Sequence, residues 1–470
     1  KRKYLLWGGL LLILLLAFIV RIWPIQLIHW WDETVYLQHA EIFAGLRADL
    51  FNEFHLRPPL LSIIFAIGFL VWNSPITASI IASLLGVVGV WYVYRLGKIL
   101  YDQKTGIIAG LAMGLSPFIV ENSRTLMTDV PALSFLTAAS YYTVRFIRTR
   151  GSTSGFIAGI LWSSAILMRF AVLPLFATLF VSYCLFFRTQ SSLPTGKKTP
   201  QKIPVFWVGM GLLLIPYFIW SQIQFGFFFA PFINATSAVS EVSGGILFYF
   251  AELLPKYTLF TLLGLAAYGW SSFRKRNHTE TDIFLGVWLV LGLLILTIAQ
   301  HKEERYLLSI ISLPLIILSS RGVASAIGWI SSKTLPIKGI ATIVIIGIFI
   351  LSFSPAFTRL NEPFLNTQIT TEEFSISNFI TNQSSSAEWV VYASNNWPVF
   401  AYYTKLKIIH LQPSDESFYS SYPRNMPKKG VIVIYLDGSH PTPKWADQQP
   451  TFNKIKEFKN AVLYQYTPAD

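Results

Sequence analysis

Charged side chains that could carry acid–base chemistry gather in a few short stretches of this sequence. In HWWDETVYLQHAEIF, residues 29–43, Asp32 and Glu33 stand beside two tryptophans, directly after an apolar run. A carboxylate can act as a general base toward a hydroxyl group. This stretch is therefore a candidate for the part of a site that takes a proton from an acceptor.

Three further stretches add charged groups of both signs. They are ENSRTLMTDVPAL with Glu121, Arg124 and Asp129, HLRPPLL with Arg57, and AQHKEERYLL with His301, Lys302, Glu303, Glu304 and Arg305. Arginine and lysine suit a phosphate, and the arginine fork fits one especially well. The mixture indicates a phosphate leaving group together with an acceptor that loses a proton.

The composition is that of an integral membrane protein. Of 470 residues, 53% are hydrophobic and 13% are charged, and the mean hydropathy is +0.50, values far from those of soluble globular proteins. The net charge of +13 comes mainly from short basic tracts between apolar runs. Because membrane proteins place such tracts in their cytoplasmic connections, the charge argues against a nucleic acid as a partner. The single cysteine, Cys184, excludes a disulfide framework and a cysteine-based metal site.

Apolar runs of about 15 to 25 residues predict the membrane helices. Eleven are expected, near residues 4–24, 75–95, 105–121, 130–146, 155–168, 170–187, 203–221, 246–270, 283–299, 306–320 and 339–356. The basic residues Lys1–Lys3 precede the first run, which we interpret as a retained helix with its N-terminus in the cytoplasm. The basic tracts then fall in every second connection, and the charged stretches described above all lie outside.

The first outside loop is expected to be large and to contain two helices. Residues 34–46 predict an amphipathic surface helix whose polar stripe holds Gln38, Glu41, Gly45 and Asp49. The run PPLLSIIFAIGFLVW, residues 58–72, is short for a full span. We expect it to be a re-entrant or membrane-skimming helix.

From residue 357 the composition becomes mixed. AEWVVYAS, LKIIHLQ, GVIVIYLDG and NAVLYQYT predict short strands, and NWPVFAYYTK and FNKIKEF predict helices. The expected fold is an all-α polytopic membrane domain over residues 1–356, followed by a small extracytoplasmic α/β domain over residues 357–470.

Each charged candidate also has a purely structural explanation. These are helix capping for Asp32 and Asp129, snorkelling toward the lipid headgroups for Arg124, Lys302 and Arg305, and a loop boundary for Arg57. The histidines of the outside loops lack the close spacing that unites metal ligands. We therefore assign no metal ligand and leave a divalent metal open.

Taken together, the four stretches resemble the GT-C membrane glycosyltransferases. WWDETVYLQHAEIFAG, HLRPPLL and SRTLMTDVPAL are similar to loops of the protein O-mannosyltransferases and of the bacterial aminoarabinose transferases that modify lipid A. HKEERYLLSIISLPLI resembles the His-Lys-Glu-Glu-Arg-Phe signature of mannosyltransferases that extend lipid-linked oligosaccharides, with Tyr306 in place of the Phe. The similarity covers roughly residues 1–320, and its specificity lies in the combination of short motifs.

The resemblance implies an inverting transfer of a sugar, mannose or a related hexose or pentose, from a polyprenyl- or dolichyl-phosphate donor to a hydroxyl of a protein, lipid or glycan, with no required cofactor. It implies a multi-pass protein of the plasma membrane whose site faces outside. By position, Asp32 would be the general base, with Glu33 in the same motif and Asp129 as the second acidic residue. Donor-phosphate binding is implied for Arg57, Arg124, His301 and Arg305.

Two other classes of protein remain as alternatives. A secondary transporter or lipid flippase would place ionisable groups near the bilayer midplane and show paired broken helices or inverted repeats. A receptor-like protein would bind its ligand through the C-terminal domain. Neither class accounts for four charged stretches on one face of the membrane.

Overall fold

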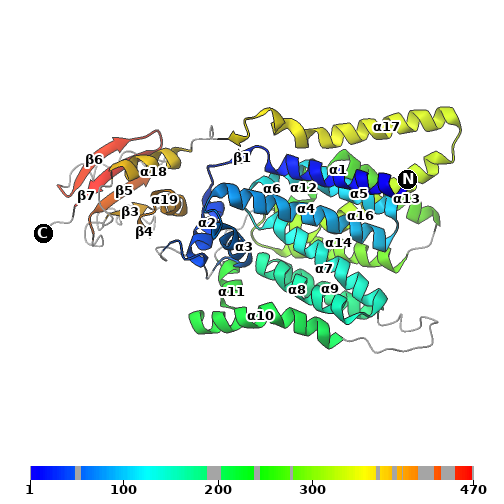
Figure 1. Cartoon of the computed structure of the whole chain (residues 1–470), viewed down its shortest axis with the longest axis horizontal. Coiled ribbons are helices and arrows are strands. Elements are labelled where there is room, and N and C mark those ends of the chain that lie inside the picture. Colours follow the sequence, from blue (N-terminus) through cyan, green and yellow to red (C-terminus); the bar gives the residue numbers. More distant parts are fainter. Residues whose placement is uncertain are drawn as a thin grey trace. The chain divides into compact units, whose positions relative to one another are not determined.

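The structure, a computed structural model, describes residues 2–47, 54, 56–187, 203–237, 244–275, 279–366, 371–383, 389–393, 395–410, 428–435 and 450–467 (Figure 1). Its contacts divide the chain into two compact units. The first comprises Lys1–Ile25, Phe54–Leu61 and Ala78–Phe364, and the second comprises Gln26–Glu53, Ser62–Thr77 and Leu365–Asp470. Most of the first outside loop therefore belongs to the same unit as the C-terminal part of the chain.

The first unit is built from apolar helices (Figure 1). They are α1 (Arg2–Ile22), α4 (Pro75–Leu100), α5 (Gln103–Leu115), α6 (Pro117–Arg124), α7 (Asp129–Thr149), α8 (Ser152–Met168), α9 (Val172–Phe187), α10 (Ile203–Phe225), α11 (Ala230–Ser237), α12 (Phe248–Lys256), α13 (Leu259–Lys275), α14 (Glu280–Ile298), α15 (Tyr306–Ile310), α16 (Ser312–Ser331), α17 (Leu335–Phe353) and the 3-10 helix η2 (Ser354–Asn361). Each apolar run of the sequence coincides with one or two of them.

Several of these helices have the length and composition of membrane spans, as expected of a multi-pass membrane protein. Among the described residues five helices meet both criteria, and six do if α5 and α6, which meet at a 50° bend, form one span. The five are Pro75–Leu100, Ile203–Phe225, Glu280–Ile298, Ser312–Ser331 and Lys338–Asn361. The count of eleven spans stays a prediction.

Three of the predicted helices are broken, and the run 105–121 divides between α5 and α6 ahead of Pro117. The run 246–270 divides between α12 and α13 beside Pro255, and the run 306–320 divides between α15 and α16 ahead of Pro314. Proline lacks the N–H that would continue the helical hydrogen bonds, so the expectation of one continuous helix is wrong in all three runs. The helix α3 (Leu60–Phe69) has only 10 residues, which confirms that residues 58–72 form no full-length helical span.

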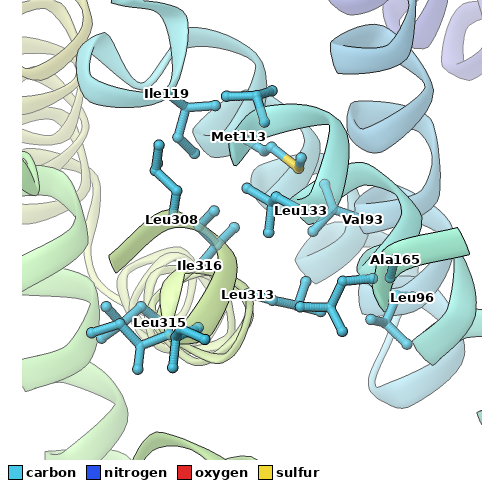
Figure 2. Close-up of a cluster of buried hydrophobic side chains, with 14 of the residues drawn as sticks. Val93, Leu96, Met113, Ile119, Leu133, Ala165, Leu308, Leu313, Leu315 and Ile316 are labelled. Carbon is cyan, nitrogen blue, oxygen red and sulfur yellow. The ribbon is translucent and has the colours of Figure 1, made fainter. Parts of the chain in front are cut away.

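One continuous apolar core joins these helices. Val93 of α4, Met113 of α5 and Leu133 of α7 lie in the same buried cluster as Leu308 of α15 and Ile316 of α16 (Figure 2). This core holds α15 against α7, and the start of each of these two helices carries a charged residue from the motifs.

Glycines let α8 and α10 approach backbone to backbone. A Cβ atom on Gly159 would overlap the carbonyl oxygen of Phe206, and one on Gly209 would overlap that of Phe156. Small residues at a crossing permit this close contact between membrane helices. The position of α8, and of the residue that ends it, depends on this packing.

The second unit contains a five-stranded sheet of order β4-β3-β5-β7-β6. Its strands are β3 (Val390–Ala393), β4 (Lys407–His410), β5 (Gly430–Tyr435), β6 (Phe452–Glu457) and β7 (Ala461–Tyr466). β3 is parallel to β4 and β5, whereas β7 is antiparallel to β5 and β6. The helices α18 (Glu372–Gln383) and α19 (Trp397–Thr404) pack on one face of the sheet. The predicted small α/β domain is confirmed as a fold.

The short strands β1 (Ile25–Gln26) and β2 (Leu365–Asn366) lie where the chain passes from one unit to the other in sequence.

The stretch FNKIKEF is a strand, and the prediction of a helix there is wrong. Its apolar residues recur every three positions, at Phe452, Ile455 and Phe458, a spacing typical of a helix. In the structure the stretch forms β6, and the pairing with β7 shifts register between Lys454 and Lys456. A bulge of this kind resets the two-residue alternation of a strand, so the spacing of three arises without a helix.

The helix of the first outside loop begins earlier than expected and is buried. It is α2 (Trp31–Phe43), and each residue from Glu33 to Glu41 is buried. Gln38, on the predicted polar stripe, donates a hydrogen bond of 2.9 Å to the carbonyl oxygen of Pro398 in α19. The expectation of a surface helix is therefore wrong. Asp49, also placed on that stripe, lies outside the described residues.

Candidate functional site

The first residue of α7 and the residue that ends α8 form a buried ion pair. Asp129 opens α7, with Thr128 at the N-cap position, and is fully buried. Arg169 stands at the C-cap of α8, where the backbone becomes extended. A guanidinium nitrogen of Arg169 lies 2.7 Å from a carboxylate oxygen of Asp129. Since Thr128 holds the cap position, helix capping does not account for the carboxylate of Asp129.

Arg169 also contacts the start of α15. Its guanidinium carbon lies 4.9 Å from the centre of the Tyr306 ring, in a cation–π arrangement. One of its nitrogens lies 3.5 Å from the hydroxyl oxygen of Thr128. The ends of α7, α8 and α15 therefore meet at this one side chain.

The segment before α15 gathers a second set of charges around Glu303. The Glu303 carboxylate accepts hydrogen bonds from His301, at 2.9 Å, and from Arg305. Its backbone N–H donates to the hydroxyl oxygen of Tyr249 in α12. Burial by itself would raise the pKa of Glu303, but the hydrogen bonds from Arg305 and His301 outweigh it and hold this pKa below its ordinary value. The carboxylate is thus ionised at neutral pH and holds both the Arg305 and the His301 side chains.

Two contacts join these sets of charges. A guanidinium nitrogen of Arg305 lies 3.9 Å from the Met127 sulfur, two residues before Asp129. The His301 ring lies 6.1 Å from the Tyr306 ring. We call the joint group the Asp129 cluster, and its members are Asp129, Arg169, His301, Glu303, Arg305 and Tyr306.

Arg124 lies in the first unit and is held by main-chain groups. It ends α6, is buried, and donates hydrogen bonds to the carbonyl oxygens of Val20 in α1 and Ala356 in η2. Its guanidinium also lies 3.6 Å from Glu121, which pairs with Arg359 at 2.9 Å. In the structure, Arg124 therefore ties three helices together, and its predicted role in phosphate binding stays a prediction.

The two carboxylates of the first motif have different surroundings in the second unit. Glu33 is buried, accepts the backbone N–H of Trp30 at 3.0 Å, and lies 3.3 Å from the His29 ring. Asp32 stands one residue earlier, inside the first turn of α2, and is partly exposed. The N-cap position belongs to Trp30, so the explanation of Asp32 as the cap is wrong. Glu33 performs the capping, and Asp32 presents its carboxylate from the first turn.

The C-terminal part of the chain contacts this motif directly within the second unit. The backbone N–H of His29 donates 2.6 Å to the hydroxyl oxygen of Tyr403. Burial raises the pKa of Tyr403 to about 12, so the hydroxyl keeps its proton. Tyr403 was not a candidate, because nothing in the sequence connects it with a motif more than 370 residues away.

The predicted site residues thus divide between the two units. Asp129, His301 and Arg305 come together in the Asp129 cluster of the first unit. Arg57 also belongs to the first unit, where it lies partly buried in the turn before α3. Asp32 and Glu33 belong to the second unit. Arg169 is not among the predicted site residues, and its pairing with Asp129 depends on the packing of α8.

The described residues contain no group of three or more His, Cys, Asp or Glu side chains arranged to hold a metal ion.

Comparison with known proteins gives a family match and a fold match. Residues 56–220, from the turn before α3 to α10, match the family described as dolichyl-phosphate-mannose-protein mannosyltransferase. No curated protein sequence matches the chain. Among solved structures, ArnT from Cupriavidus metallidurans bound to undecaprenyl phosphate is similar with a TM-score of 0.70 at 12% identity, over 99% of this chain and 98% of that one.

Two larger proteins share the fold. The oligosaccharyltransferase of Archaeoglobus fulgidus tethered with an acceptor peptide has a TM-score of 0.64 at 12% identity, over 92% of this chain and 69% of that one. The arabinofuranosyltransferase AftD from Mycobacteria has a TM-score of 0.60 at 13% identity, over 99% of this chain and 41% of that one. The family match and these neighbours confirm the resemblance to the GT-C membrane glycosyltransferases and the predicted enzyme class.

Proposed function

We propose that this chain, which has the fold of the GT-C glycosyltransferases, moves a sugar from a polyprenyl or dolichyl phosphate to an acceptor hydroxyl on the outer face of the plasma membrane. The observation that carries the proposal is the Asp129 cluster, where two arginines, a histidine and two carboxylates from two motif segments and the end of α8 come together in one apolar bundle. Ionisable groups within membrane proteins are costly and mark functional sites.

The arginines and the histidine of the cluster supply the chemistry that a donor phosphate requires. Arg305 and His301 bind the phosphate oxygens in this proposal, with Arg57 and Arg124 as further ligands. Glu303 holds Arg305 and His301 in place before the donor arrives, and such preorganised charges stabilise a leaving group more effectively than flexible ones. The family description names dolichyl-phosphate-mannose, and the ArnT neighbour is bound to undecaprenyl phosphate. Both are consistent with a lipid-phosphate donor.

Asp32 is the general base of the proposed reaction. Its carboxylate takes the proton of the acceptor hydroxyl while the hydroxyl oxygen forms a bond to the anomeric carbon. The bond from that carbon to the phosphate oxygen breaks on the opposite side, and polyprenyl phosphate departs with the bonding electrons. This displacement inverts the anomeric configuration and needs no acid on the leaving group. Asp32 lies partly exposed in the first turn of α2, where an acceptor can reach it, whereas Glu33 is buried.

Asp129 acts as the second acidic residue of the site, where its carboxylate is paired with the Arg169 guanidinium. The acceptor is a hydroxyl of a protein, lipid or glycan, and the sugar is mannose or a related hexose or pentose. The assignment to the outer face is supported by the basic tracts, which alternate along the sequence with the motif loops.

The test is donor consumption by the protein in nanodiscs. The protein is incubated with radiolabelled polyprenyl-phosphate mannose, glucose or aminoarabinose, with a membrane extract as the acceptor source. We expect one donor to be consumed, with release of polyprenyl phosphate in step with labelled product. A folded protein that consumes none of the three donors in excess of a protein-free control would overturn the proposal.

Donor binding is tested separately with Arg305→Gln. A hydrogen bond to a charged group contributes about 1.5–3 kcal/mol, so the KM for the donor should rise about tenfold or more. The matched control is Arg321→Gln, which removes another paired arginine, in α16, whose guanidinium lies 2.8 Å from the Asp102 carboxylate. The control should leave the KM unchanged, and equal effects of both substitutions would argue against a donor site at Arg305.

A further inference from the structure

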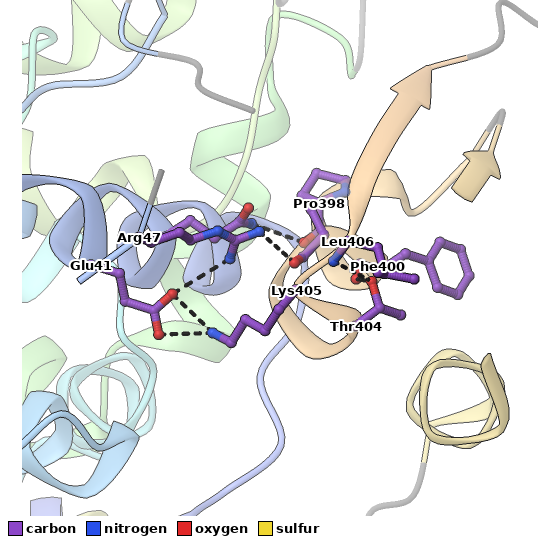
Figure 3. Close-up of polar contacts among 9 residues, drawn as sticks. Glu41, Arg47, Pro398, Phe400, Thr404, Lys405 and Leu406 are labelled. Atoms are coloured by element: carbon purple, nitrogen blue, oxygen red, sulfur yellow. Dashed lines mark hydrogen bonds and ion pairs between the residues drawn. The ribbon is translucent and has the colours of Figure 1, made fainter. Parts of the chain in front are cut away.

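A buried carboxylate in α2 connects the first loop with the C-terminal part of the chain inside the second unit. Glu41 has a side chain that is only 7% exposed. Its two oxygens lie 2.8 and 2.9 Å from the Lys405 ammonium, and one of them lies 3.4 Å from the Arg47 guanidinium (Figure 3). We call these three residues the Glu41 network.

The cations of the network reach the end of α19. Lys405 is the C-cap residue of α19, in a left-handed backbone conformation (φ 58°). Arg47, in the turn after α2, donates a hydrogen bond of 2.6 Å to the carbonyl oxygen of Ala401 in the last turn of α19 (Figure 3). Arg47 thus neutralises the carboxylate and satisfies a helix-end carbonyl at once. Burial lowers the pKa of both Lys405 and Arg47, and the Glu41 charge opposes this in each case.

The remaining contacts run along the same helix face. Trp31, Gln38 and Glu41 are spaced seven and three residues apart, which places them on one side of α2. The Trp31 and Trp397 rings meet edge to face at 5.6 Å, and Gln38 bonds to the carbonyl oxygen of Pro398. Asp32 follows Trp31 directly in the sequence. The contacts of Trp31 before it, and those of Gln38 and Glu41 after it, therefore fix the rotation of the helix turn that carries Asp32.

We propose that the C-terminal part of the chain is a positioning element for catalysis, and that the Glu41 network locks α2 on α19 so that the Asp32 carboxylate keeps its reactive orientation. The proposal rests on the proposed role of Asp32. Glu41, Arg47 and Lys405 are positioning residues, because they act through α2 and are assigned no contact with the donor or acceptor.

An ionic lock suits this task better than apolar packing alone. Burying charges costs free energy that their attraction only partly returns, but ion pairs can specify one register where apolar side chains permit several. Catalytic groups must hold their geometry closely, and a displacement of about 1 Å can cost about 10²-fold in rate. A network of two cations on one carboxylate fixes both the position and the rotation of α2.

The test compares turnover per folded molecule in three variants. Glu41→Gln keeps the shape of the side chain but removes its charge, and we expect kcat to fall about 10- to 100-fold while the donor KM changes less than about twofold. Lys405→Met should give a smaller loss in the same direction, because Arg47 still faces Glu41, and Lys405→Arg should restore the rate. The donor is the one that the wild type consumes among polyprenyl-phosphate mannose, glucose and aminoarabinose.

The matched control is Glu457→Gln, which removes a carboxylate from an exposed pair with Lys454 in β6 of the same unit. It should leave kcat unchanged. Hydrogen exchange provides a readout independent of activity: amides of α2 should exchange faster in Glu41→Gln and in Lys405→Met, and not in the control.

The outcomes distinguish this inference from the proposed function. Wild-type kcat in both Glu41→Gln and Lys405→Met, with Asp32→Asn inactive, would overturn the positioning role and leave the glycosyl transfer intact. Loss of folded protein with an unchanged kcat in the folded fraction would reduce the network to structural support and also overturn it. A wild type that consumes no donor would remove the proposed function, and the inference with it.

Discussion

Asp129 and Arg169 form a buried ion pair of 2.7 Å that joins the start of α7 to the end of α8. Arg169 extends the junction to α15 through the face of Tyr306. The negative charge of Asp129 balances the positive charge of Arg169 beside the apolar core of the helix bundle. This relationship explains how an aspartate and an arginine 40 residues apart in the sequence become parts of one cluster.

Loss of the Asp129 charge should destabilise the first unit. Asp129→Asn leaves the Arg169 guanidinium without its counterion, and removing one partner of a buried pair costs about 3–5 kcal/mol. Unfolding of the detergent-solubilised protein, followed by circular dichroism, measures the change. Glu457→Gln breaks an exposed pair and should cost at most about 1 kcal/mol. Equal stability of Asp129→Asn and the wild type would show that the pair is not formed.

The Tyr306 ring, rather than its hydroxyl, should hold Arg169. Tyr306→Phe keeps the ring and should leave the stability unchanged within error. Tyr306→Leu removes the cation–π contact and should cost about 0.5–2 kcal/mol in the same unfolding assay. A larger loss in Tyr306→Phe than in Tyr306→Leu would contradict the arrangement seen here.

The Glu303 carboxylate should make the protein sensitive to acid. Its pKa in the folded state lies below the ordinary value of 4.5, so the group binds its proton more readily when the chain is unfolded. Its contribution to stability is therefore complete well above pH 4.5 and is lost as the pH falls through the folded pKa. The difference in Tm between the wild type and Glu303→Gln should be constant near neutral pH and shrink in acid. A difference that grows on acidification would contradict the sign of the shift.

The close crossing of α8 and α10 should tolerate no larger side chain. Gly209→Leu places a branched chain against the backbone of Phe156, and the helices must separate, so both the Tm and the folded yield should fall. Gly286→Ala in α14 is the control, because a Cβ there meets nothing within 4 Å. That substitution should be neutral or stabilise by about 0.5–1 kcal/mol, the propensity difference between glycine and alanine in a helix. A folded Gly209→Leu protein with wild-type Tm would contradict the crossing.

The sequence predicts the helical runs well, because apolar length is a local property that a bilayer selects directly. The prolines made the helix breaks beside Pro255 and Pro314 predictable. The position of the helix after each break depends on how that helix packs. The strand at 452–458 was missed, because a bulge imitates helical spacing. Burial of Glu41 was missed because its partners, Arg47 and Lys405, come from a turn and from a helix more than 360 residues later.

The candidate site was predictable only as a set of motifs. Asp129, His301 and Arg305 stood out because charges are rare beside apolar runs. Nothing in the sequence marked Arg169 as the partner of Asp129, or Tyr403 as the partner of His29, since both pairings arise from tertiary packing. Single motifs therefore indicate the chemistry, and the pairings that orient it require the fold.

The most direct test of the central claim is the rate of donor consumption by Asp32→Asn in nanodiscs, measured against the wild type with the same labelled polyprenyl-phosphate sugar and membrane extract. A general base contributes about 10²–10⁴-fold to a rate. We predict a loss of that size, with donor affinity and Tm close to those of the wild type. A rate within about threefold of the wild type, well short of the contribution of a general base, would contradict the assignment of Asp32 as the base.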